Sequence, residues 1–243
     1  MTRPDNRRFV FIGDGHGNHE IVHQAVSWAH TKRAHVVMLG DLTDSAHRTT
    51  RDQMRLLHLT LREMGYGATC LWGNHDLSYL FPNRFKCSGY SRNKRDRFSE
   101  LYGKLWRHDN FRPFLWLRDE RILVTHAGLA PSLVPEGGSP VTFLQNLKTE
   151  EFIAHPRLLQ PGQHSGGREP TGGITWLRKE ESTLPLPRIT QIVGHTPHEH
   201  AHYDSARNTW YIDTLDASRD ILLLDDGALT VVPYERYASW QTR

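Results

Sequence analysis

Short apolar runs that each end in a polar motif recur along this chain and constrain its fold more than any other feature. Such runs are typical of buried strands, and they occupy residues 9–12, 36–39, 69–72, 122–124 and 189–193. The motifs that follow them are Gly-Asp-Gly-His at 13–16, Gly-Asp at 40–41, Gly-Asn-His-Asp at 73–76, Thr-His-Ala-Gly at 125–128 and Gly-His-Thr-Pro at 194–197. The motifs therefore lie at the carboxyl ends of strands, where α/β sheets place their ligand sites.

Segments with helical periodicity separate the early strands and predict a mostly parallel sheet. Apolar residues on one face indicate a helix at 19–31, with Asn18 as its N-cap, and a second helix at 50–64. Alternation of strand, helix and strand favours parallel pairing. Further helices are expected near residues 97–106 and 142–151.

The last part of the chain returns to strands. Alternating apolar stretches predict strands at 209–213, 221–224 and 229–232, with Asp225-Asp226-Gly227 as the hairpin turn between the last two. We expect these strands in a second sheet that packs on the first. The expected fold class is α/β, a two-sheet β-sandwich flanked by helices.

Length and composition favour one globular unit. The chain has 243 residues and 37% hydrophobic content, which suffices for a full core. We expect a single domain over residues 1–243, with loop-rich insertions near the active site at about 78–112 and 131–187. Glycine and proline are frequent in the second insertion, and loops over a site commonly determine substrate choice.

The polar residues of the five motifs have the composition of a dinuclear metal site. Two divalent ions held close together need a bridging carboxylate, oxygen and imidazole ligands, and open positions for water and substrate. A single histidine among the 16 here is more often a surface residue than a ligand, but five ordered motifs favour a site. The absence of a thiolate favours Mn, Fe, Zn, Co or Ni over a structural zinc site. The candidate ligands are Asp14, His16, Asp41, Asn74, His126 and His195.

In their order and context, these motifs resemble the calcineurin-like metallophosphoesterase superfamily. Within it they resemble the branch of protein serine/threonine phosphatases and bacterial diadenosine tetraphosphate hydrolases, because Pro197 stands where many phosphodiesterase relatives have a second ligand histidine. The resemblance runs from about residue 8 to residue 215 and implies a four-layer α/β/β/α fold. It also implies two divalent ions, with Mn as the first expectation.

The resemblance assigns a role to each motif residue. Asp41 bridges the two ions; the first ion is also bound by Asp14 and His16, and the second also by Asn74, His126 and His195. His75 matches the histidine that protonates the leaving group, and Asp44 matches the carboxylate that orients this histidine.

Two departures from the family pattern concern the binding of phosphate. Ser45-Ala46 and Trp72 stand where family protein phosphatases usually have arginines that clamp the substrate phosphate. Arg48 is the nearest substitute. Arg178 is a second candidate, in a segment that resembles a tryptophan-containing segment of these phosphatases.

These observations predict a metal-dependent phosphoester hydrolase that uses metal-activated water, of the serine/threonine phosphatase-like type, acting on phosphoprotein or small phosphoesters. The alternative is a hydrolase of dinucleoside polyphosphates, cyclic nucleotides or RNA-terminal phosphates. A noncatalytic binding module on this fold would need a lost ligand residue, and the sequence retains each one.

The net charge and the distribution of apolar residues limit which binding partners and which location we expect. The net charge of +3 is far from that of a nucleic-acid binder, so no stable nucleic-acid binding is expected. No apolar run is long enough to span a bilayer, and residues 1–8 lack the apolar core of a signal peptide. Two cysteines make no disulfide framework. We therefore expect a cytoplasmic protein. A local basic cluster is either a solvated face or a rim that attracts polyphosphate or RNA; it comprises Arg84, Lys86, Arg92, Lys94, Arg95 and Arg97.

Overall fold

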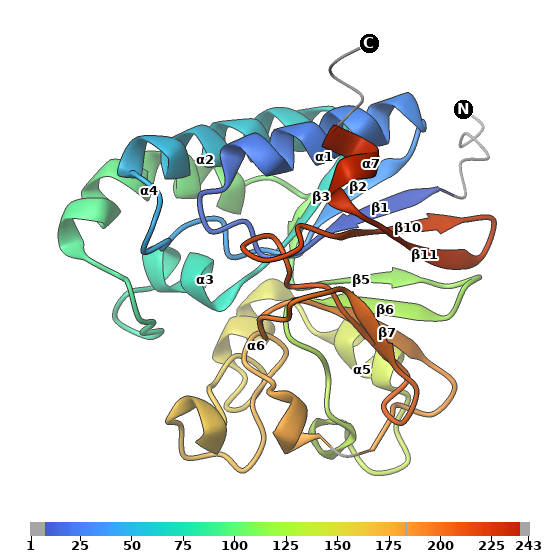
Figure 1. The fold of residues 1–243 in the computed structure, drawn as a ribbon. Coiled ribbons are helices and arrows are strands. Elements are labelled where there is room, and N and C mark those ends of the chain that lie inside the picture. The colour runs from blue at the N-terminus through green and yellow to red at the C-terminus, as the bar shows by residue number, and fades with distance from the viewer. Residues whose placement is uncertain (1–7, 183, 239–243) are drawn as a thin grey trace.

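The computed structural model describes residues 8–182 and 184–238, in which two mixed sheets pack face to face (Figure 1). The first sheet has the strand order β11-β10-β1-β2-β3-β4. Strands β1 to β4 pair in parallel, and β10 joins β1 in the antiparallel direction. The bounds are β1 (Phe9–Ile12), β2 (His35–Met38), β3 (Thr69–Leu71), β4 (Phe111–Arg112), β10 (Ile221–Asp225) and β11 (Ala228–Val232).

The second sheet has the strand order β5-β6-β7-β9-β8. Its central strands β6, β7 and β9 are parallel, whereas β5 and β8 run antiparallel at the two edges. The bounds are β5 (Phe114–Leu117), β6 (Ile122–Thr125), β7 (Thr190–Val193), β8 (His202–Asp204) and β9 (Thr209–Tyr211).

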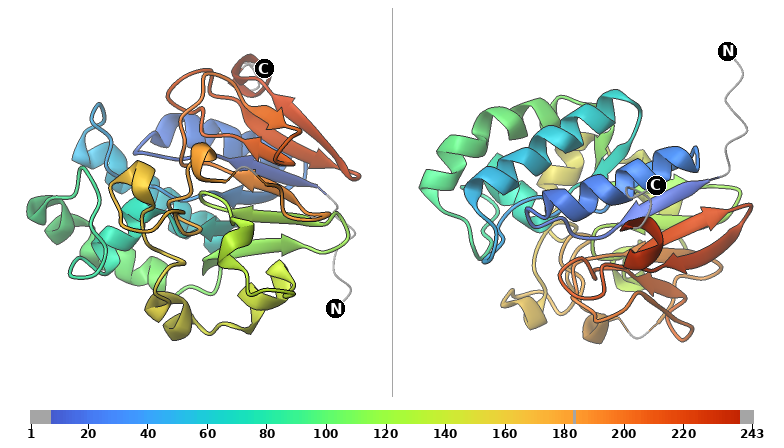
Figure 2. Two further views of the ribbon diagram at one scale, coloured as in Figure 1. Left: turned by 90° about the horizontal axis from the view of Figure 1, so that it is seen from below. Right: turned by 45° about the horizontal axis from the view of Figure 1, so that its top comes forward.

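Helices cover the outer faces of both sheets (Figure 1). Helices α1 (His19–Thr31), α2 (Thr50–Gly65) and α4 (Arg92–Trp106) lie side by side over the first sheet (Figure 2, right). The short helix α3 (Asn74–Leu80) follows β3, and α7 (Tyr234–Ala238) packs on α1. Below the second sheet lie α5 (Pro140–Asn146), α6 (Thr149–Ala154) and the 3₁₀ helices Pro131–Leu133, Gln163–Ser165 and Lys179–Glu181.

Alternation of side chains along the strands builds the core. Phe11, Val37 and Ile192 are buried between the two sheets, whereas Val10 and Met38 face the helices. Full burial of an aliphatic or aromatic side chain of this size contributes about 1.5–3 kcal/mol. This core holds the carboxyl ends of the strands, and hence the motifs, in place.

The two-sheet sandwich flanked by helices confirms the expected fold class, but the placement of the last strands was partly wrong. Only β9 joins the second sheet; β10 and β11 join the first, where Phe11 pairs with Leu222. The alternating pattern of β10 suits the inner face of either sheet, so the pattern alone did not choose between them. The hairpin turn is confirmed, with positive φ at Asp226 (47°) and Gly227 (82°).

Three local expectations also differ from the structure. Asn18 stands at the N-cap position of α1 but makes no cap hydrogen bond with its side chain, whose Nδ2 donates to Leu215 O at 3.3 Å. Helix α4 begins at Arg92, where the Ser91 hydroxyl caps the first turn, so the segment 78–112 is more helical than expected. The helix expected at 142–151 is two helices, α5 and α6.

Some expectations stay predictions. The single-domain organisation is one of them. The absence of a signal peptide concerns mainly residues 1–7, which lie outside the described residues. In the part of the chain that the structure describes, no helix is long and apolar enough to cross a membrane.

Candidate metal centre

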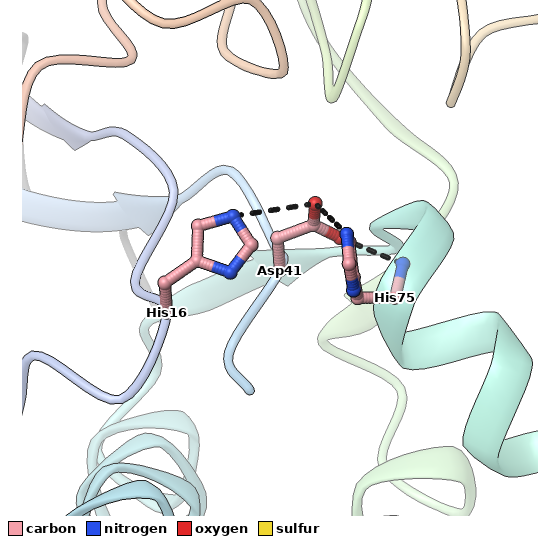
Figure 3. Close-up of side chains that lie close together, drawn as sticks. All are labelled: His16, Asp41 and His75. Atoms are coloured by element: carbon pink, nitrogen blue, oxygen red, sulfur yellow. Dashed lines mark hydrogen bonds and ion pairs between the residues drawn. The ribbon is translucent and has the colours of Figure 1, made fainter. Parts of the chain in front are cut away.

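The loops that follow five strands converge at one edge of the two sheets. His16, Asp41 and His75 lie close together although they follow β1, β2 and β3 (Figure 3). A second cluster shares Asp41 and adds His126 and His195, which follow β6 and β7. The structure thus brings together residues that are far apart in the sequence, as expected from their places after strands.

One oxygen of Asp41 lies at the centre of both clusters. Asp41 Oδ2 is 3.8 Å from His16 Nε2, 3.4 Å from His126 Nε2 and 4.0 Å from His75 Nε2. These separations are too long for strong hydrogen bonds. Two atoms that ligate one ion, each about 2.1 Å from it, lie roughly 3–4 Å apart. The spacing of the Asp41 oxygen from His16 and His126 therefore suits an ion on either side of it.

Backbone carbonyls fix the two rings so that their Nε2 atoms face Asp41. His16 Nδ1 donates to Thr43 O at 2.8 Å, and His126 Nδ1 donates to Leu39 O at 2.7 Å. A carbonyl can only accept, so Nδ1 carries a proton, and Nε2 is the nitrogen left to bind a metal ion. Metal-ligating histidines commonly have this arrangement.

Asn74 and His195 add further acceptor atoms at the same place. Asn74 Oδ1 is 2.9 Å from His126 Nε2 and 3.1 Å from His195 Nδ1, while Asn74 Nδ2 donates to Cys87 Sγ at 3.0 Å. The opposite amide orientation would turn Nδ2 toward these ring nitrogens. With the oxygen inward, several lone pairs face one another, an arrangement that a cation stabilises. His195 Nε2 is buried and has no hydrogen-bond partner among the described residues.

Asp14 lies on the other side of the cluster. Both of its carboxylate oxygens accept from His195 N, at 3.0 and 3.1 Å, and Oδ2 is 4.0 Å from His16 Nε2. Burial is the main cause that raises the pKa of Asp14 to about 7, and the nearby Asp41 carboxylate adds to it. Asp213, which the sequence reading missed, is also buried beside Asp14, and its pKa is raised well above the ordinary value.

The backbone is strained where these side chains begin. His16, Asp41 and His195 have positive φ values of 38°, 49° and 65°. Each such residue costs about 1–3 kcal/mol and persists only where its surroundings enforce it. Gly73 and Gly194 allow the close approach, because a Cβ would collide with Asp41 Oδ1 at the first position and with Asp14 Oδ1 at the second.

The electrostatic field at the cluster favours positive charge. Burial alone would lower the pKa of His126, but the carboxylates of Asp41 and Asp14 outweigh it and raise this pKa to about 10. Burial would likewise raise the pKa of Asp41, but His126 and His75 hold it below its ordinary value. A site that binds protons this tightly also attracts divalent cations. The donor set and the field therefore fit the two ions that the sequence predicts.

His75 and Asp44 form a hydrogen-bonded pair beside the cluster. His75 Nδ1 lies 3.0 Å from Asp44 Oδ2, and the backbone N–H of His75 donates to Asp41 Oδ1 at 2.9 Å. Burial lowers the pKa of His75, but Asp41 and then the hydrogen bond to Asp44 outweigh it and raise the pKa to about 11. His75 is therefore protonated at neutral pH and carries a proton on the Nε2 that faces the cluster.

The candidate phosphate-binding arginines differ in their surroundings. Arg48 Nη2 is engaged by Asp216 Oδ1 at 3.0 Å. Arg178 Nε donates to Ser165 Oγ at 3.3 Å. Arg178 also lies near His195. The pKa of His195 is lowered mainly by burial, then by His126, and to a smaller extent by Arg178. Trp72 is only 2% exposed and packs on Trp106 and Phe152, so it belongs to the core.

The sequence analysis also missed residues that are not candidate ligands but hydrogen-bond to the loops of the site or to Asp44. Asp76 accepts hydrogen bonds from the backbone of Asp41, Leu42 and Gly73. Tyr79 and Lys94 both donate to Asp44. The signal for Asp76 was its place in the Asn-His-Asp motif, whereas no sequence pattern marked Tyr79. Lys94 was grouped with a basic cluster instead.

A comparison of the sequence with protein families identifies the class. The family described as calcineurin-like phosphoesterase matches residues 7–230, and the chain belongs to this family. The chain is therefore a metal-dependent hydrolase that acts on phosphorylated substrates. No curated protein sequence matches the chain.

Solved structures with the same fold include several phosphatases. A cold-active protein-tyrosine phosphatase of Shewanella has a TM-score of 0.60 and 16% identity, over 97% of this chain and 82% of that one. A candidate diadenosine tetraphosphatase has a TM-score of 0.53 and 17% identity, over 96% of both chains. A protein serine/threonine phosphatase from Saccharomyces cerevisiae has a TM-score of 0.54 and 13% identity, over 95% of this chain and 80% of that one. At these identities the likeness concerns the fold alone.

Proposed function

We propose that this chain is a phosphatase of the serine/threonine phosphatase-like type, with a dinuclear centre in which Asp41 bridges the two ions. The observation that carries the proposal is the position of Asp41 Oδ2 between His16 Nε2, at 3.8 Å, and His126 Nε2, at 3.4 Å. The first ion would also be bound by Asp14, and the second by Asn74 and His195. When bound, such ions lower the pKa of water and supply a nucleophile at neutral pH.

Two residues of the chain would then protonate the leaving group and orient the proton donor. His75 donates its Nε2 proton to the departing oxygen, because its high pKa keeps it protonated and its Nε2 lies 4.0 Å from Asp41 Oδ2. Asp44 accepts from Nδ1 and so holds the ring in this orientation. No side chain of the site is needed as a covalent nucleophile.

We propose Arg178 as the main contact for the substrate phosphate and Arg48 as an auxiliary one. Arg178 lies close enough to His195 to lower the pKa of that histidine, and the one described hydrogen bond of the Arg178 guanidinium is to the neutral Ser165 hydroxyl. The guanidinium of Arg48 is already paired with Asp216. A planar guanidinium with free N–H groups can bind two phosphate oxygens at once.

We expect Mn as the resident metal, with Fe, Zn, Co or Ni as alternatives, because the ligand set combines carboxylate, amide and imidazole groups. We further propose a cytoplasmic location, since Cys70 and Cys87 are both free thiols.

The test compares substrates on one preparation of metal-stripped protein, without added metal and with Mn, Fe, Zn, Co or Ni ions added in turn. The substrates are p-nitrophenyl phosphate, its bis ester and diadenosine tetraphosphate. Faster metal-dependent hydrolysis of the monoester supports the proposed phosphatase. Preference for the dinucleotide would select the polyphosphate hydrolase instead, and no hydrolysis with any of the five metals would contradict the proposal.

A variant separates the role of His75 from metal binding. His75→Ala should slow phenyl phosphate, which has a poor leaving group, by at least ~100-fold more than 2,4-dinitrophenyl phosphate, because general acid catalysis is worth about 10²–10⁴-fold. Equal losses on both esters would argue against His75 as the proton donor.

A further inference from the structure

The carboxylate of Asp44 is held from two sides. Its Oδ2 faces His75 Nδ1 at 3.0 Å, whereas its Oδ1 accepts from Tyr79 Oη at 2.6 Å and from Lys94 Nζ at 3.1 Å. The side chain of Asp44 is fully buried. A buried carboxylate is costly unless its lone pairs are satisfied and its charge is balanced. Lys94 therefore supplies a second positive partner beside His75.

Lys94 reaches this position from the segment that follows the metal motifs. It lies in the first turn of α4, its side chain is 25% exposed, and its ammonium also donates to Gly89 O at 2.9 Å. Gly89 has a φ of 81° and packs directly on Asp44, where an added Cβ would lie 3.0 Å from Asp44 Cβ. Lys94 thus ties both its helix and the loop before it to Asp44.

Four other members of the basic cluster behave differently from Lys94. Arg84, Lys86, Arg92 and Arg97 are exposed, and no ion pair involves them within residues 8–182 and 184–238. Their exposure suits a solvated face and a rim for polyphosphate or RNA equally, so for them both interpretations stay predictions. For Lys94 the interpretation as part of a solvated face was wrong, because its charge is directed inward onto Asp44.

We propose that Lys94, together with Tyr79, is a positioning residue for the Asp44–His75 pair. By occupying Asp44 Oδ1, it leaves Oδ2 directed at His75 Nδ1 and keeps the imidazole turned with Nε2 toward Asp41. Lys94 acts through Asp44 and does not contact the substrate, since its Nζ is committed to Asp44 and Gly89. The proposal rests on the proposed function, in which His75 is the proton donor.

The test uses Lys94→Met, Lys94→Arg and, as the matched control, Lys104→Met. Lys104 lies on the same helix and is half exposed, and among the described residues its ammonium pairs only with Glu100, at 2.6 Å. In the Mn²⁺-loaded enzyme, Lys94→Met should lower kcat/KM for phenyl phosphate by about 10-fold and that for 2,4-dinitrophenyl phosphate by less than about 2-fold. Lys94→Arg should restore most of the loss, and Lys104→Met should match the wild type.

A second readout is independent of turnover. With diamagnetic Zn²⁺ in place of Mn²⁺, the proton on His75 Nδ1 should give a low-field imidazole N–H signal in the ¹H NMR spectrum, assigned by its loss in His75→Gln. The signal should be present in the wild type and in Lys94→Arg, and lost in Lys94→Met through faster exchange with water. If Lys94→Met does not fold, Lys94→Gln gives the same comparison with a neutral donor.

Three results would overturn the proposal. They are an unchanged signal in Lys94→Met, equal loss on both esters, or a loss confined to KM, which would make Lys94 a substrate contact. If the wild type hydrolyses no ester with any metal, the proposed function fails, and the N–H signal still decides whether Lys94 positions His75.

Discussion

The side chain of Asp76 accepts a hydrogen bond from the backbone N–H of Asp41 at 2.8 Å. The same carboxylate accepts from Leu42 N at 3.0 Å, Gly73 N at 3.0 Å and Tyr102 Oη at 2.8 Å. It thereby joins the loop after β2 to the start of α3 and holds Asp41 in its strained backbone conformation. The position of Asp41 thus depends on a buried residue that is not itself a candidate ligand.

Asp76→Asn should destabilise the protein by about 1–3 kcal/mol. The amide group would replace one acceptor oxygen by a donor and place it against a backbone N–H, leaving both buried and unpaired. Urea unfolding measures the difference. The exposed Asp119→Asn serves as control and should stay within about 0.5 kcal/mol of the wild type. Equal stability of the two variants would show that Asp76 does not support the loop.

Arg178→Ala should lower kcat/KM by about 10- to 100-fold, because it removes a charged donor from the phosphate. Arg48→Ala should have a smaller effect, since Arg48 is already paired with Asp216. Steady-state kinetics with a phosphomonoester compare the two variants. A larger loss for Arg48→Ala would reverse this assignment.

Added Mn²⁺ should raise the melting temperature of metal-stripped protein. Asp14 and Asp41 are 3% and 2% exposed, and a bound cation relieves the repulsion between them. At a free concentration of 100 times Kd, binding stabilises by about 2.7 kcal/mol, which for a chain of this size corresponds to roughly 5–10 °C. Differential scanning calorimetry measures the shift. An unchanged melting temperature at millimolar Mn²⁺ would argue against a metal centre.

The two thiols should differ in reactivity. Cys70 is fully buried in β3, and burial raises its pKa well above the ordinary value, whereas Cys87 is partly exposed beside Asn74. A thiol titration should therefore find one reactive cysteine in the native protein and two after unfolding. Modification of Cys70 at the rate of Cys87 would contradict the packing of β3.

The sequence predicted which side chains converge better than it predicted the contacts that support them. His16, Asp41 and His126 each follow a strand by a few residues, so the common edge of parallel strands brings them together whatever the loops do elsewhere. Strand pattern also predicted the fold class. It did not decide which sheet receives β10, because Leu222 and Leu224 suit the inner face of either sheet.

The supporting contacts depend on tertiary paths that no local pattern records. In the sequence, Lys94 is one of several cations in a basic stretch. Its contact with Asp44 depends on the path of residues 81–92 in the fold. Asn18 has the residue type of an N-cap, but its side chain donates to Leu215 O and makes no cap hydrogen bond. In both cases a residue distant in the sequence supplies the partner.

The most direct test of the central claim measures metal content and turnover together, in the wild type and in Asp41→Asn. The wild type should bind about two ions per chain and hydrolyse a phosphomonoester only when they are present. Asp41→Asn should lose at least one ion and nearly all turnover, because Asp41 Oδ2 faces both His16 Nε2, at 3.8 Å, and His126 Nε2, at 3.4 Å. Full turnover in Asp41→Asn, or turnover in the wild type without bound metal, would contradict the dinuclear account.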